Sequence, residues 1–334
     1  MLKRVDDGEF QSINHGYNTV FRLNRLSLGL VVPLEAYAQG PVPSMNDHIE
    51  RVRLAEKLGF SAIWLRDVPF NVPSFGDAGQ VYDPFVYLGL LAGQTQRIAL
   101  GVASIILPLR HPAHVAKAAA SVDVLSDGRL ILGVASGDRP AEYPALNLSF
   151  DDRGERFRDS LDYIEHMWQD APVFENSCGS PHGGMDMLPK PTRGKLPLLI
   201  TGGSQQDPDW IVRHGDGWII YPRGIAAQAR IIGDWRARVE AVRGPAKPAV
   251  QSLYVDLTKD PQAVPQPIHL GFRLGVNHLR AYLKSLEEIG VNHVALNLRF
   301  NQADMEETLE RIADDIMSDF SKAGLAESRE SDHA

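Results

Sequence analysis

Residues 97–138 read RIALGVASIILPLRHPAHVAKAAASVDVLSDGRLILGVASGD, and this stretch is the most informative about the fold. Two nearly continuous apolar runs, Ile98–Ser104 and Leu130–Ser136, are typical of parallel strands covered on both faces. The segment between them is a predicted helix, so the stretch forms one strand–helix–strand unit. The small side chains of this helix allow close approach, either at a subunit interface or in tight packing within the chain; they are Ala113, Ala116, Ala118, Ala119 and Ala120.

Six further apolar runs continue the alternation of strand and helix. They are Ser27–Pro33, Ala62–Arg66, Leu198–Gly202, Gly217–Tyr221, Ala249–Leu257 and His293–Arg299. Between the runs, apolar residues recur at helical spacing, as at Phe157, Leu161 and Ile164. Eight strand–helix units predict an α/β fold, the (β/α)8 TIM barrel. A doubly wound sheet is the alternative, and the absence of GxGxxG after the first run argues against it.

Three segments lie outside this alternation. We predict a single barrel domain over residues 26–322, with an N-terminal leader at 1–25 and a polar tail at 323–334. Residues 171–195 contain four glycines and four prolines, which predicts a long loop inserted after the fourth βα unit.

Composition and charge narrow the classes of function. The 334 residues carry a net charge of −8 without a Lys/Arg-rich stripe, so we predict no nucleic-acid partner. No stretch approaches the roughly 18 apolar residues of a membrane span, and Asp6, Asp7 and Glu9 argue against a secretory signal. Cys178 is the single cysteine, so no internal disulfide is expected. These features together predict a cytoplasmic protein that does not act at a membrane.

In a TIM barrel the chemistry lies at the carboxyl ends of the strands, and two of these ends contain glycine and small polar residues. Residues 201–206 read TGGSQQ, where glycines and helix-start amides favour a phosphate; a plain tight turn explains the stretch equally well. Residues 136–139 read SGDR, which is either a second ligand-binding end or a capping turn.

Charged residues follow the first two predicted strands. Glu35, Arg66 and Asp67 are candidate catalytic residues because all three can face one pocket; a structural ion pair at the barrel rim is the alternative. No histidine or lysine stands directly at a strand end, which argues against a metallohydrolase and a Schiff-base aldolase. We therefore predict no metal site.

Three stretches resemble the bacterial luciferase-like superfamily of flavin-dependent monooxygenases. They are RIALGVASIILPLRHP (97–112), DVLSDGRLILGVASGD (123–138) and PLLITGGS (197–204), in the family's order and spacing. The resemblance runs from about Leu26 to Phe320. It implies a TIM barrel that binds reduced FMN and uses dioxygen on a small organic substrate. It also implies a separate flavin reductase and a homodimer, while some relatives use a deazaflavin coenzyme instead.

The resemblance also implies which residues contact the flavin. Relatives hold the flavin phosphate near the ends of the fourth and fifth strands and the ring over the end of the third. The matching positions here are Ala103, Ser104, Ser136, Gly137, Tyr143, Gly202, Gly203 and Ser204. A non-prolyl cis peptide is implied between Ala103 and Ser104.

Two positions depart from luciferase itself. Luciferase has a catalytic histidine just after its second strand, where this chain has Arg66–Asp67, and Ser136 stands where luciferase has its phosphate arginine. Light emission is therefore not expected. The leading interpretation is a flavin monooxygenase; a deazaflavin-dependent hydride-transfer enzyme and a non-catalytic flavin-binding protein are the alternatives. The charges of Glu35, Arg66 and Asp67 favour a working enzyme over the last of these.

Overall fold

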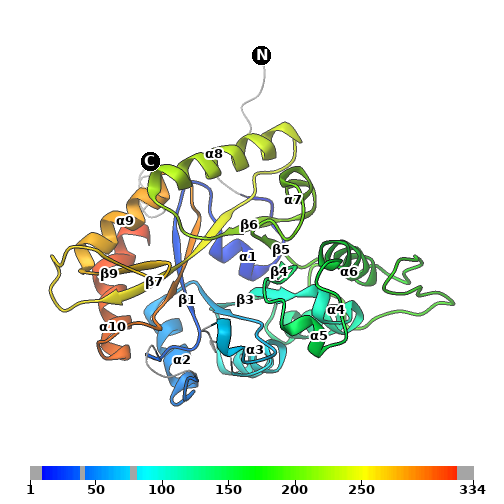
Figure 1. Ribbon diagram of the computed structural model, residues 1–334, viewed down its shortest axis with the longest axis horizontal. Helices are drawn as coiled ribbons and strands as arrows, with labels where there is room; N and C mark the ends of the chain where they lie inside the picture. Colours follow the sequence, from blue (N-terminus) through cyan, green and yellow to red (C-terminus); the bar gives the residue numbers. More distant parts are fainter. Residues whose placement is uncertain (1–9, 38–41, 76–80, 322–334) are drawn as a thin grey trace, which may run out of the picture.

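The computed structural model describes residues 10–37, 42–75 and 81–321. Within it, eight parallel strands close into a barrel, β1 to β7 in chain order followed by β10, which pairs with both β7 and β1. These strands are β1 Ser27–Val31, β2 Ala62–Leu65, β3 Ala99–Ile106, β4 Leu130–Ala135, β5 Leu198–Thr201, β6 Gly217–Ile220, β7 Ala249–Leu257 and β10 His293–Asn297. Each strand coincides with one of the predicted runs, so the prediction of a TIM barrel is confirmed (Figure 1).

Helices follow the strands and cover the outside of the barrel (Figure 1). They are α2 His48–Leu58, α3 Pro84–Gln94, α4 Pro112–Leu125, α5 Glu142–Ala145, α6 Arg153–Met167, α7 Pro208–His214, α8 Ile225–Ala241, α9 Val276–Glu288, α10 Met305–Ile312 and α11 Ser318–Ser321. The described residues also form two short 3₁₀ turns, Pro73–Phe75 and Leu107–Leu109, and a π-helical segment, Ala313–Met317. Among the described residues, no helix has both the length and the apolar character that crossing a bilayer requires.

The alanine-rich face of α4 packs within the chain. Ala116, Ala119 and Ala120 are fully buried in the core, and α4 packs against α6. Trp168, which follows α6, donates a hydrogen bond from its indole N–H to the carbonyl of Ala116 at 3.1 Å. Of the two interpretations of these alanines, the structure therefore supports tight intramolecular packing.

The predicted leader folds into the barrel from Phe10 onward. It forms helix α1, His15–Val20, whose Tyr17 joins an apolar cluster inside the barrel together with Trp64. The Tyr17 hydroxyl donates to the carbonyl of Asp216, which directly precedes β6. Gly16 is required for this approach because a Cβ there would lie 2.4 Å from the carbonyl oxygen of Arg129, just before β4. Helix α1 therefore closes the amino-terminal end of the barrel.

Two segments stand out from the repeating units. Residues 171–195 contain only an isolated bridge between Asn176 and Gly179 and project to the right in Figure 1, which agrees with the predicted loop. The second segment is a hairpin of β8, Gln266–Ile268, and β9, Gly271–Leu274, which the sequence analysis did not predict. Strand β9 pairs with the last residues of β7, so the hairpin extends the carboxyl-terminal side of the barrel.

Candidate active site

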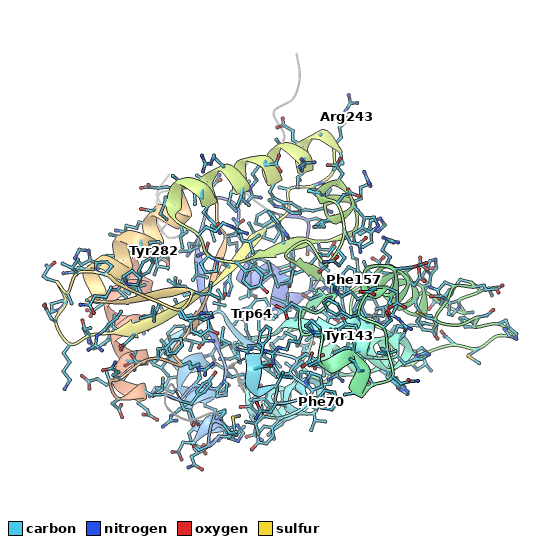
Figure 2. The ribbon with its side chains drawn as sticks, in the orientation of Figure 1. Trp64, Phe70, Tyr143, Phe157, Arg243 and Tyr282 are labelled. Atoms are coloured by element: carbon cyan, nitrogen blue, oxygen red, sulfur yellow. The ribbon has the colours of Figure 1, made fainter. Side chains whose placement is uncertain are left out.

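The carboxyl ends of the strands surround a cavity of about 530 Å³. This volume lies within the range of small-molecule binding sites. The floor is apolar and includes Trp64, which lies near the centre of the barrel (Figure 2). Charged side chains gather on the wall: Arg66, Asp67, Asp138, Arg139 and Glu142. An apolar floor beneath a few polar groups suits an organic ring system with polar substituents.

The end of β3 forms part of the cavity wall. The peptide bond between Ala103 and Ser104 is cis, as predicted, and both residues line the cavity. The Ser104 hydroxyl forms a short hydrogen bond with the hydroxyl of Thr201, at the end of β5. The ends of β3 and β5 are thereby linked directly, and they border the same cavity.

The loop after β5 forms a cradle of backbone N–H groups. Gly202, Ser204 and Gln205 have positive φ values of 55°, 42° and 59°, and all three line the cavity. Within the described part of the chain, the amides of Gly203, Ser204 and Gln205 donate no hydrogen bond. Consecutive free amides in a turn of this kind bind anions, because several N–H dipoles converge on one point. This observation favours a phosphate site over a plain turn.

The wall around Ser136 and Gly137 is supported from behind by Tyr143. The Tyr143 hydroxyl donates a short hydrogen bond to the carbonyl of Ser136, and its ring is fully buried. Burial raises the pKa of Tyr143 to about 12, so the hydroxyl keeps its proton. Ser136 and Gly137 are among the described cavity-lining residues, whereas Tyr143 is not. The predicted flavin-contacting side chain therefore lies one layer behind the cavity surface.

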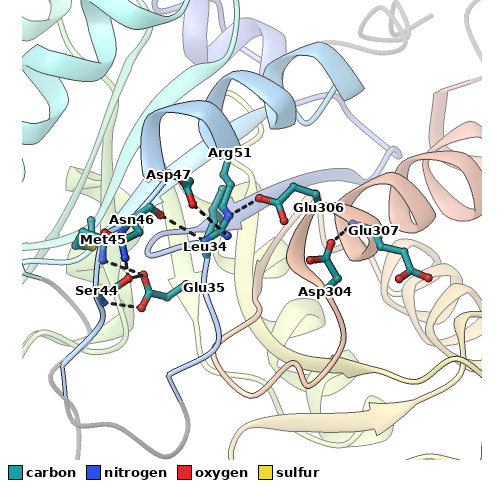
Figure 3. A network of polar contacts seen from close by, with 10 residues as sticks. All are labelled: Leu34, Glu35, Ser44, Met45, Asn46, Asp47, Arg51, Asp304, Glu306 and Glu307. Carbon is teal, nitrogen blue, oxygen red and sulfur yellow. Dashed lines mark hydrogen bonds and ion pairs between the residues drawn. The ribbon is translucent and has the colours of Figure 1, made fainter.

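Glu35 lies apart from the other two predicted catalytic residues. Its carboxylate accepts hydrogen bonds from the backbone amides of Ser44 and Met45, at 2.6 and 2.9 Å, and from the Ser44 hydroxyl (Figure 3). The described residues that line the cavity do not include Glu35. The structure thus gives Glu35 a local role, which is to hold the chain just before α2.

Asp67 lines the cavity but is held in a buried ion pair. Its side chain is 1% exposed, and its two oxygens accept bonds from the Arg110 guanidinium at 2.7 and 2.9 Å. The backbone amide of Ile106 donates a third bond at 3.1 Å. Asp67 is therefore in an ion pair, as one of the two interpretations proposed, but the partner Arg110 comes from the turn after β3. Arg66 also lines the cavity.

Sequence reasoning missed Glu142, a carboxyl group on the cavity wall. The residue is 3% exposed, and burial is the main cause that raises its pKa to about 7. Arg139 lowers this pKa, while Asp67 and Asp138 raise it. The only signal in the sequence was its position next to Tyr143. Nothing local distinguishes a buried glutamate from a solvated one.

The upper rim of the cavity also contains residues that the sequence did not indicate. The β8–β9 hairpin contributes His269 and Leu270, and Phe75 lies beneath the Arg139 guanidinium at 4.3 Å from the ring centroid. Tyr254, at the end of the barrel part of β7, contacts His269 edge-on. These aromatic and apolar groups line the cavity beside the charged wall.

The fold and this site together define a TIM-barrel protein with an anion cradle beside a cis peptide. The luciferase-like monooxygenase family model matches residues 26–328, and the chain belongs to this family. It is similar to the oxygenase component of a flavin-dependent trigonelline monooxygenase from Acinetobacter baylyi, with 23% identity over 75% of this chain and 69% of that protein.

Two further similarities extend the comparison. An F420-dependent hydroxymycolic acid dehydrogenase from Mycobacterium tuberculosis is 27% identical over 56% of this chain and 50% of its own length. Among solved structures, a monooxygenase from Streptomyces bottropensis superposes with a TM-score of 0.73 at 19% identity, covering 88% of this chain and all of that one. The predictions of fold and family are therefore confirmed.

Proposed function

We propose that this protein is an oxygenase that uses reduced FMN and dioxygen to oxygenate a small organic substrate. The observation that carries the proposal is the row of free amides at Gly203, Ser204 and Gln205 on the wall of a cavity that also contains Ala103–Ser104. A similar protein that is named as an oxygenase component supports a separate flavin reductase as partner.

The residues present fit FMN. The free amides after β5 can take the phosphate oxygens. A Cβ on Gly203 would meet nothing closer than the Gln206 carbonyl at 4.0 Å, so there is open space beside this residue. Arg66 and Arg139 line the same cavity and add positive charge. Ala103 and Ser104 would support the ring. When bound and reduced, FMN supplies the electrons that activate dioxygen.

The chain's own charged residues then have distinct roles. Arg66 is placed to hold a polar group of the substrate at the cavity wall. Asp67 acts as a positioning residue, because its bonds fix Arg110 and the backbone of Ile106 at the end of β3. Glu35 orders residues 44 and 45 at a distance from the cavity. The apolar floor around Trp64 excludes water from beneath the ring.

A deazaflavin coenzyme is the second candidate, with hydride transfer in place of oxygenation. The similarity to an F420-dependent dehydrogenase supports it. The amide cradle does not discriminate between FMN and the deazaflavin, because both coenzymes carry a phosphate that the same N–H groups can bind. FMN is preferred because the similarity to the flavin-dependent monooxygenase component extends over more of the chain, 75% against 56%.

A homodimer in the cytoplasm completes the proposal. The outer face of α3 exposes Val86 at 74% and Leu90 at 45%, and a Cβ added at Gly89 or Gly93 would meet nothing within 4 Å. An apolar helix face with small residues suits close packing against a second copy. The single cysteine is consistent with a reducing compartment.

Anaerobic titration of the protein with reduced FMN, and separately with the reduced deazaflavin coenzyme, tests the proposal. We expect micromolar binding of reduced FMN, weaker binding of the deazaflavin, and oxygen consumption after air is admitted. Tight binding of the deazaflavin alone would favour hydride transfer. If neither coenzyme binds, the proposed function is wrong.

A further inference from the structure

Glu142 carries a polar atom that the protein itself leaves unsatisfied. The residue lies on α5, lines the cavity and is 3% exposed. Its Oε1 is shielded from solvent and has no hydrogen-bond partner in the part of the chain that the structure describes. Its backbone amide, in contrast, is bonded to the carbonyl of Arg139 at 3.1 Å. The missing partner therefore concerns the carboxyl group and not the backbone amide.

Two other buried carboxyl groups, those of Asp123 and Asp67, have hydrogen-bond donors within the chain. Asp123, inside the core, accepts bonds from the Asn14 amide and from the backbone and hydroxyl of Thr192. Asp67, in the same cavity wall, has three donors. A buried polar atom without a partner costs about 1–3 kcal/mol, so it is retained where something else completes it. For Glu142 the adjoining space is the cavity, and the completing group would be a ligand.

The charges around Glu142 determine which partner it can take. Arg139 and Asp138 come from the loop after β4, and Asp67 comes from the segment after β2. Burial opposes ionisation and so do the two aspartates, while Arg139 favours it; the resulting pKa of Glu142 is about 7. The carboxyl group is thus neutral at slightly acidic pH, and in that form it is a hydrogen-bond donor.

Resting on the proposed flavin site, we propose that Glu142 is a cofactor-contacting acid that donates a hydrogen bond from its neutral carboxyl group to an acceptor atom of the flavin ring. An oxidised flavin ring presents carbonyl oxygens and unprotonated nitrogens, so it offers acceptors that match this donor. Ionisation of Glu142 would replace the hydrogen bond with repulsion between lone pairs. Flavin affinity then depends on pH through this one residue.

The affinity for oxidised FMN, measured by fluorescence quenching from pH 6.5 to 9, tests the inference in the wild type, Glu142→Gln and Glu142→Ala. The affinity of the wild type for oxidised FMN should fall by up to about tenfold per pH unit above the transition near pH 7. Glu142→Gln keeps an N–H donor and does not titrate, so its affinity should stay flat and strong. Glu142→Ala has no donor and should bind about tenfold more weakly at pH 6.5.

Glu165→Gln is the matched control. Burial also raises the pKa of Glu165, but this residue is not among the described cavity-lining residues, so the variant should follow the wild-type profile. If wild type and Glu142→Gln show the same pH profile, the inference is overturned while the flavin site stands. If the wild type binds reduced FMN but binds oxidised FMN at no pH, the inference is overturned while the proposed function stands. If it binds neither form, the proposed function is overturned together with the inference. Should Glu142→Ala fail to fold, the comparison with Glu142→Gln decides alone.

Discussion

The two ends of the barrel differ in whether their polar atoms have hydrogen-bond partners within the chain. At the amino-terminal end, Tyr17 on α1 fills the interior and its hydroxyl has a backbone partner. In the same region, His293 is fully buried, and its two ring nitrogens bond the Ser27 hydroxyl at 2.7 Å and the Trp64 indole N–H at 2.8 Å. Here the polar atoms are satisfied within the chain.

At the carboxyl-terminal end, polar groups face a cavity and several lack partners within the described residues. The amides of Gly203, Ser204 and Gln205 donate no bond, and Oε1 of Glu142 accepts none. The amino-terminal end therefore provides stability, while the carboxyl-terminal end keeps hydrogen-bonding capacity for a ligand. Substitutions at the first end should alter unfolding, and substitutions at the second should alter binding.

Tyr17→Ala should have the largest effect on stability. Loss of a fully packed aromatic ring is expected to lower the unfolding free energy by about 3–5 kcal/mol. Urea denaturation followed by circular dichroism measures this change. The matched control is Tyr221→Ala, because Tyr221 is 47% exposed at the cavity and should cost less than about 1 kcal/mol. Equal losses in the two variants would contradict the comparison.

His293→Gln should change how stability responds to acid. Burial lowers the pKa of His293 to about 3, so below pH 6.5 the unfolded chain binds a proton that the folded chain does not. The unfolding free energy of the wild type should therefore fall by about 3 kcal/mol through this residue between pH 6.5 and 4. The variant should be less stable at pH 7, because it loses the packing and hydrogen bonds of His293. Glutamine does not titrate, so the unfolding free energy of the variant should fall less between pH 6.5 and 4. Parallel pH profiles would show that His293 is not held neutral.

Asp67→Asn and Glu35→Gln distinguish the roles of the two carboxylates that the sequence analysis predicted to be catalytic. Asparagine at 67 removes one of the two carboxylates that pair with the partly buried Arg110, the other being Asp83, so we expect a loss of about 1–3 kcal/mol and slower turnover. Glu35→Gln should retain turnover, because the bonds of Glu35 within the described residues go to Ser44 and Met45, away from the cavity. Thermal unfolding and oxygen uptake measure both. A stronger loss of turnover in Glu35→Gln would reverse this assignment.

Gly203→Val should affect binding with little effect on folding. The backbone φ of Gly203 is not positive, and a Cβ would meet no atom closer than 4.0 Å. A branched side chain would instead enter the space in front of the free amides, and FMN affinity should fall at least tenfold, about 1.4 kcal/mol. If fluorescence quenching shows unchanged affinity, the assignment of the phosphate site to this loop is wrong.

The strands could be predicted because their apolar runs are local, and the cis peptide at Ala103–Ser104 followed from the family resemblance. The remaining features depend on contacts between distant residues. Asp67 and Arg110 are 43 positions apart, and α1 meets the barrel through Asp216, 199 positions from Tyr17. Glu142 differs from a surface glutamate only through burial, which no local pattern encodes.

The most direct test of the central claim is a crystal structure of the protein with FMN. We expect a phosphate on the amides of Gly203, Ser204 and Gln205, with the isoalloxazine ring against Ala103–Ser104 and within hydrogen-bond distance of Glu142. A flavin bound elsewhere, or a phosphate away from the loop after β5, would contradict it.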